Sequence, residues 1–271
     1  MAQHTEFDAR MKGYENTNKL FLMKQTPVIV RIDGRAFHTF TKGLKKPFDD
    51  VLSRAMARTA EYLLNNISNC VFAYTQSDEI SLLLCDYQTP TTSPWFDNNQ
   101  QKLVSQSASI ATLAFNKFFH EESVREELLA TGDLEYFTVL EKKQMIALFD
   151  SRAFNVPKEE IVNYFIWRQQ DATRNSIQMV AQANFSHRAL QGKNTSELQD
   201  MLMLEKGINW NNVPTRFKRG TAIYKQATTV KHVVNGEEVE VVRNKSLIDI
   251  EMPILTADRD FIKKVAGFDI Y

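Results

Sequence analysis

Short apolar runs alternate, in the first half of the chain, with segments in which apolar residues recur every three or four positions. Val28, Ile29, Val30 and Ile32 form such a run behind Pro27, and this pattern is typical of a buried strand. Residues 48–63 instead show i, i+3, i+4, i+7 spacing, which predicts an amphipathic helix. By these two patterns we expect helices at 8–18, 48–63 and 102–120, strands at 28–32, 70–75, 80–85 and 145–149, and a loop at 88–100.

The second half of the chain is mainly helical in pattern. Apolar stripes predict a long helix at 159–185 and a shorter one at 196–204. Two β-rich segments at 229–234 and 238–242 flank Asn235-Gly236, the strongest short signal for a β-hairpin. We therefore expect a single domain over 1–271, with a core at about 24–152 and a helical and hairpin extension at about 153–271.

The expected order in the core is strand–helix–strand–strand–helix–strand, the ferredoxin-like βαββαβ arrangement of an α+β fold. A crossover helix makes the first two strands parallel, so both end at the same edge of the sheet. Asp33 follows the first strand there, and the turn Ser77-Asp78-Glu79 follows the second. The fourth strand runs the other way, which predicts that Asp150 lies at the opposite edge, away from this cluster.

Composition is that of an ordinary globular protein, with 43% hydrophobic and 24% charged residues and a formal net charge of zero. A basic surface for nucleic acid must therefore be local. Cys70 and Cys85, the only two cysteines, lie in apolar runs and predict buried thiols in a reducing compartment. The N-terminus lacks the pattern of a secretory signal, and no apolar window is long enough to span a membrane. We expect a cytoplasmic protein.

Asp33 and Asp78 are the candidate metal ligands. Paired carboxylates at one sheet edge suit Mg²⁺, and the Gly34 carbonyl can add an oxygen ligand. Backbone N–H groups of Arg35 to His38, helped by Lys46, can form an anion site for a triphosphate. The alternative is a carboxylate-rich turn that binds no metal. Glu79 lies beside the site, but strand alternation aims it differently from Asp78.

Several basic side chains are candidates for contacts with phosphate. Arg152, Arg168 and Arg174 can bind a second nucleotide or RNA, or can be surface salt-bridge partners. The segment Arg216-Phe-Lys-Arg219, which includes Lys218, can hold an RNA backbone or be an exposed basic turn. His38 can be a general base, a phosphate contact or a packing residue.

Three motifs resemble the tRNA-His guanylyltransferase superfamily: Arg31-Ile-Asp-Gly-Arg-Ala-Phe-His38, Tyr74-Thr-Gln-Ser-Asp-Glu79, and Trp167-Arg-Gln169 with Asp171. The resemblance covers roughly residues 10–225. It implies a palm-like fold similar to that of nucleic-acid polymerases, with RNA extended in the reverse, 3′-to-5′ direction. It implies two Mg²⁺ ions on Asp33 and Asp78, with the Gly34 carbonyl on one of them. It further implies nucleotide contacts from Asp33, Gly34, Arg35, Ala36, Phe37, His38, Ser77 and Asp78, with Lys46 and Asp49 close by.

The reaction implied by the resemblance has two stages. ATP or GTP first activates a 5′-monophosphorylated RNA end, and the 3′-hydroxyl of an incoming nucleotide then attacks the α-phosphate of that end. The resemblance also suggests a homotetramer that binds tRNA.

One segment departs from the eukaryotic pattern of the family. Those members carry His-Ile-Asn-Asn where this chain has Thr173-Arg-Asn-Ser176, so that only Asn175 matches. The chain therefore resembles the branch that repairs 5′-truncated tRNAs by templated addition. The alternatives are strict addition of one guanosine to tRNA(His), a palm-fold nucleotide cyclase or forward polymerase, and a non-catalytic RNA-binding module.

Overall fold

A six-stranded sheet organises the chain in a computed structural model, which describes residues 5–89, 91–129, 133–234 and 237–266. The spatial order of the strands is β4-β1-β3-β2-β5-β6, and all neighbours are antiparallel. The first four strands have the predicted ferredoxin-like order, which confirms the α+β class. The strands are β1 (Val28–Gly34), β2 (Cys70–Gln76), β3 (Glu79–Leu84), β4 (Phe149–Asn155), β5 (Thr221–Val234) and β6 (Glu237–Asp249).

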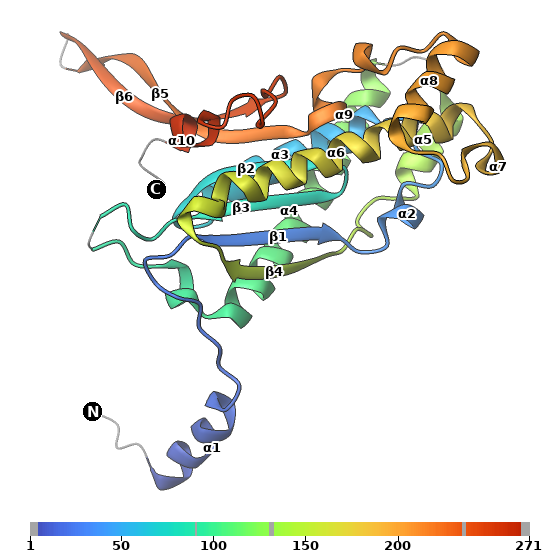
Figure 1. The fold of residues 1–271 in the computed structure, drawn as a ribbon. Helices are drawn as coiled ribbons and strands as arrows, with labels where there is room; N and C mark the ends of the chain where they lie inside the picture. The colour runs from blue at the N-terminus through green and yellow to red at the C-terminus, as the bar shows by residue number, and fades with distance from the viewer. Residues whose placement is uncertain (1–4, 90, 130–132, 235–236, 267–271) are drawn as a thin grey trace.

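Helices cover both faces of the sheet (Figure 1). One face packs on α3 (Asp50–Asn66) and α4 (Gln100–Leu129), and the other packs on α6 (Ile161–Asn184). Because both faces of β1, β2 and β3 are covered, the sequences of these strands are nearly continuous apolar runs. The remaining helical elements are α1 (Glu6–Asn16), α2 (Phe37–Phe40), η1 (Trp95–Asn98), α5 (Leu134–Glu141), η2 (Lys158–Glu160), α7 (His187–Leu190), α8 (Thr195–Lys206), η3 (Trp210–Asn212), α9 (Thr215–Arg219) and α10 (Phe261–Ala266).

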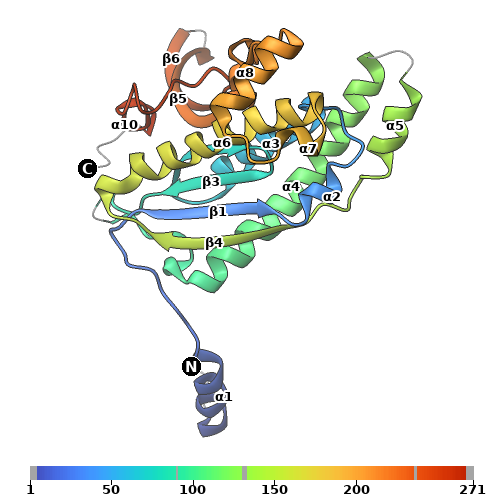
Figure 2. The ribbon, with the colours of Figure 1, turned by 45° about the vertical axis from the view of Figure 1, so that its right-hand side comes forward.

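The C-terminal half of the chain completes the sheet that the first half begins. β5 pairs with β2 from Thr221 to Tyr224 and then continues with β6 as a long two-stranded arm (Figure 1; foreshortened in Figure 2). This arm is much longer than the hairpin predicted from the sequence, and the predicted turn Asn235-Gly236 lies outside the described residues. In both views α1 stands apart from the body of the molecule. No helix in the described part of the chain is both long and apolar enough to cross a membrane.

Asp49 fixes the start of α3, beside the candidate site described below. Its buried carboxylate accepts hydrogen bonds from the Leu52 N–H (2.9 Å), the Lys45 N–H (2.9 Å) and the Tyr136 hydroxyl (2.6 Å). Burial and the hydrogen bond to this carboxylate both raise the pKa of Tyr136, so its hydroxyl stays a donor. Asp49 is thus an N-cap that also ties the 45–49 segment to α5.

We expect Asp49→Ala to lower the free energy of unfolding by about 2–4 kcal/mol, because it removes a helix cap and leaves two further donors without their acceptor. The matched control is Asp133→Ala, which removes the exposed N-cap of α5 and should cost about 1 kcal/mol. Urea titrations of both variants measure the difference. Equal losses would show that Asp49 is only a cap.

Candidate active site

Asp33 and Asp78 lie together at one edge of the sheet, as predicted. β1 pairs with β3 so that Asp33 faces Glu79, and the Gly34 N–H donates to the Asp78 carbonyl at 3.0 Å. This bond joins the end of β1 to the turn between β2 and β3. Asp33 is close enough for its charge to raise the pKa of Asp78.

The environment of Asp78 fits a cation. Burial is the main cause that raises the pKa of Asp78, and the neighbouring charge of Asp33 adds to it. The Ser77 hydroxyl donates to Asp78 Oδ1 at 3.0 Å and acts in the opposite direction. Two adjacent carboxylates repel each other, and a divalent cation between them would relieve that repulsion.

The protein offers few metal ligands here. Within the described ranges, no group of three or more His, Cys, Asp or Glu side chains is arranged to hold a metal ion. A pair of carboxylates is nevertheless sufficient for Mg²⁺, which usually keeps waters and substrate phosphates as its other ligands. The residues present therefore fit Mg²⁺ better than they fit a structural metal.

Asp150 also lies at this edge, and the prediction that it sits at the opposite one is wrong. β4 does run antiparallel to β1, but it begins at Phe149 instead of ending there, so Asp150 faces Asp33. The Arg152 guanidinium lies 3.9 Å from Asp33 Oδ2 and 3.8 Å from Asp150 Oδ1. Arg152 is thus a partner of the carboxylates at this edge.

Glu79 lies behind the pair and points to the α6 side of the sheet. Its buried carboxylate is 2.7 Å from the Arg31 guanidinium and 2.9 Å from Nε of Arg168. Burial raises the pKa of Glu79, and the charges of Arg168 and Arg31 act to lower it. Arg168 is itself only 3% exposed and also pairs with Asp171 at 2.5 Å. Arg168 is therefore a buried structural residue that holds Glu79 and Asp171 in place behind the site.

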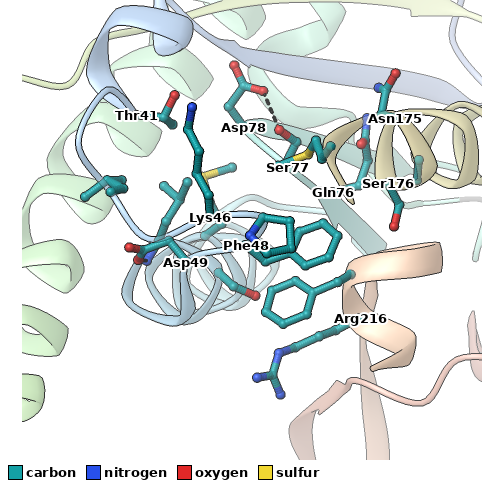
Figure 3. A pocket seen from close by; sticks show the side chains of 18 of the residues that line it. Thr41, Lys46, Phe48, Asp49, Gln76, Ser77, Asp78, Asn175, Ser176 and Arg216 are labelled. Carbon is teal, nitrogen blue, oxygen red and sulfur yellow. Dashed lines mark hydrogen bonds between the residues drawn. The ribbon is translucent and has the colours of Figure 1, made fainter. Parts of the chain in front are cut away.

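A cavity of about 480 Å³ opens on the other side of Asp78. The cavity is lined by the segment from α2 to α3, the Gln76-Ser77-Asp78 turn, α6 and α9 (Figure 3). Phe48 and Phe217, which are far apart in the sequence, stack with ring centroids 4.6 Å apart and an interplanar angle of 5°. Lys46, Asn175 and Arg216, all predicted site residues, also line this cavity.

The backbone at the end of β1 is tightly shaped. A Cβ on Gly34 would lie 2.3 Å from the ring of Phe37, so glycine is needed for close packing. Ala36 has φ 55° and Ser77 has φ 50°, both in the left-handed region. The Arg35 N–H, predicted to bind an anion, instead donates to the Leu148 carbonyl at 2.9 Å.

Other predicted residues occupy different environments. His38 lines the cavity, with Nε2 3.1 Å from the Thr39 hydroxyl. Arg174 is exposed and pairs with Asp171 at 2.8 Å. Lys218 is buried and donates to the Asn211 carbonyl at 2.5 Å, which directs its charge into the fold.

The backbone of Arg219 serves the packing of α9 on the sheet. Its carbonyl accepts a hydrogen bond from the Tyr74 hydroxyl at 2.7 Å. The predicted basic turn is therefore α9 itself, of which Arg216 reaches the cavity.

Sequence analysis identified Asn175 as a site residue but missed the rest of the cavity wall that α6 supplies. Ala172, Asn175, Ser176, Met179 and Ala183 line the cavity from successive turns of this helix. Their i, i+3, i+4, i+7, i+11 spacing places them on one face. That spacing was visible in the sequence, but small and amide side chains on a helix face do not by themselves indicate a cavity.

Comparison with known proteins agrees with this geometry. A family model described as tRNA(His) guanylyltransferase matches residues 8–157, and one described as the Thg1 C-terminal domain matches residues 159–263. The tRNA(His) guanylyltransferase of Debaryomyces hansenii is 30% identical over 236 residues, which are 80% of this chain and 79% of that protein.

Two solved structures are similar over nearly the whole chain. A bacterial tRNA(His) guanylyltransferase (Thg1)-like protein in complex with ATP has a TM-score of 0.80 and 42% identity. Such a protein in complex with GTP has a TM-score of 0.75 and 40% identity. Each match covers 97% of this chain and 100% of the other. The chain therefore belongs to the tRNA(His) guanylyltransferase family and is a nucleotidyltransferase.

Proposed function

We propose that this chain adds nucleotides to the 5′ end of tRNA in the 3′-to-5′ direction, copying the facing strand, after ATP or GTP activates that end. The observation that carries the proposal is the pair Asp33 and Asp78, of which Asp78 lines a cavity of about 480 Å³, large enough for a nucleotide. The similar bacterial structures with ATP and GTP support a nucleoside triphosphate as its occupant. Homotetramer formation and a cytoplasmic location stay predictions.

Two Mg²⁺ ions, held by Asp33, Asp78 and the Gly34 carbonyl, belong to this proposal. When bound, they would supply positive charge to the oxygens of the phosphate being transferred. The protein prepares this position by holding two carboxylates against their mutual repulsion. The Ser77 hydroxyl fixes one of them by its hydrogen bond to Asp78.

The cavity orients the nucleotide. The stacked rings of Phe48 and Phe217 give its wall an apolar surface suited to a base. Lys46 lines the cavity and can contact phosphate oxygens. The Arg216 guanidinium lies 4.7 Å from the Phe217 ring centroid and pairs with Asp50 at 2.6 Å, so its position is fixed.

Neutral substitutions at the carboxylate pair test the site. We expect Asp33→Asn and Asp78→Asn each to reduce 5′ extension by at least about a hundredfold, because the charge that holds the metal is lost. Asp78→Asn should leave the melting temperature unchanged or raise it, since it removes a partly buried charge whose pKa is already raised. The assay is gel extension of a tRNA that lacks its first nucleotide, with Mg²⁺ and nucleoside triphosphates.

The control for these variants is Asp97→Asn, which makes the same chemical change at an exposed carboxylate paired with Lys24. It should extend the tRNA like the wild type. Extension by folded Asp33→Asn and Asp78→Asn at wild-type rates would contradict the proposed site. A cyclic nucleotide or a longer 3′ end in the same reactions would instead identify a cyclase or a forward polymerase.

Single nucleotides test templating. We expect each of the four nucleoside triphosphates, supplied alone after activation of the 5′ end, to be added only where it pairs with the facing base of the truncated tRNA. The relatives named tRNA(His) guanylyltransferases favour a second candidate, the addition of guanosine alone. Addition of guanosine opposite all four facing bases would support that candidate and contradict templated repair.

A further inference from the structure

Trp167 is a large aromatic side chain that the fold leaves half-exposed beside the carboxylate edge. It lies on α6 with 49% of its surface accessible. β4 is an outermost strand of the sheet, next to β1, and its side chains Asp150 and Arg152 are 61% and 57% exposed. A surface is thus open beside Asp33, and Trp167 lies outside the cavity that Asp78 lines.

The indole is held in place by charged groups. The Arg168 guanidinium lies over the ring at 4.2 Å from its centroid, and that of Arg31 lies at 5.9 Å. Both arginines are fixed by the buried carboxylate of Glu79. Tyr164 meets the indole at a centroid distance of 5.9 Å and an interplanar angle of 64°. A rigid ring loses little conformational entropy when another ring stacks on it.

The surface that the described residues form around Trp167 carries no excess charge that would attract RNA. The ion pairs around it join four arginines to four carboxylates, so the charges of these groups cancel. The groups are Arg31, Arg152, Arg168, Arg174, Asp33, Asp150, Glu79 and Asp171. What the surface offers a ligand is therefore the exposed ring, supported by guanidinium groups, next to the site of transfer.

We propose that Trp167 is a stacking platform for a base at the 5′ end of the RNA strand that is presented to Asp33 and Asp78. This inference rests on the proposed function. The cavity is a recess that can hold a free nucleotide, whereas Trp167 lies on the protein surface, where a strand can continue past it. Stacking on an aromatic ring accepts any base, which suits an enzyme that must hold ends of different sequence.

The affinity for RNA tests the platform. We expect Trp167→Leu, which keeps an apolar side chain, to weaken binding of a 3′-labelled truncated tRNA by about tenfold. Trp167→Phe should restore most of the affinity, because it restores a ring. The slope of log Kd against log salt should not change, since no charge is removed. The measurement is fluorescence anisotropy.

The matched control is Phe96→Leu, which removes an aromatic side chain of similar exposure (40%). Phe96 lies in η1, whose Asn98 donates to the Met23 carbonyl. The Met23 N–H donates to Asn155, which pairs with the end of β1 opposite to Asp33. This variant should bind the tRNA like the wild type. Equal affinities for Trp167→Leu and wild type, or failure of phenylalanine to rescue a weakened variant, would overturn the proposal.

Intrinsic fluorescence identifies the ligand. We expect truncated tRNA to quench emission of the wild type and to quench Trp167→Phe distinctly less, whereas ATP alone should quench both proteins equally. Quenching by ATP that requires Trp167 would show that the ring binds a mononucleotide and would overturn the assignment to RNA.

If tRNA is bound through Trp167 but no nucleotide is added, the platform stands and the proposed function fails. If nucleotides are added while Trp167→Leu matches the wild type in both affinity and rate, the platform alone fails.

Discussion

The buried carboxylate of Glu79 is the constraint on which the site depends. A charge at this depth is tolerated only with partners of opposite charge, and removal of one partner from such a group typically costs about 3–5 kcal/mol. Arg31 comes from β1 and Arg168 from α6, so one carboxylate joins the sheet to the helix that covers it. Arg31 also lies 3.8 Å from Asp33 Oδ2. The position of α6 and the charge around Asp33 are thereby set together.

This arrangement gives the carboxylate edge two different sides. On one side α6 and α9 line a cavity together with the stacked rings of Phe48 and Phe217. On the other side the surface stays open, with Trp167 half-exposed beside Arg31 and Arg168. An enzyme that joins a free nucleotide to a long strand needs this asymmetry. The nucleotide must be held closely in the cavity, and the RNA strand must be able to extend across the open surface.

The sequence was sufficient where local pattern and chain direction decide the outcome. The apolar runs located β1, β2 and β3, and the crossover helix made β1 and β2 parallel, which placed Asp33 beside Asp78. It failed at β4, because the apolar run from Met145 to Leu148 resembles a strand although most of its side chains are exposed. The strand itself, Phe149–Asn155, has polar residues on its uncovered face and gives a weaker signal. The stacking of Phe217 on Phe48 depends on tertiary packing between distant segments, which no local pattern reveals.

The central claim is that Asp33 and Asp78 together bind the metal beside the nucleotide cavity. Its most direct test is a crystal structure with Mn²⁺ and a non-hydrolysable ATP analogue, since manganese is located by its anomalous scattering. The account predicts anomalous peaks within coordination distance of both carboxylates, with the analogue's phosphates as further ligands and its base in the cavity next to Phe48. An analogue bound in the cavity with no manganese at Asp33 or Asp78 would contradict it.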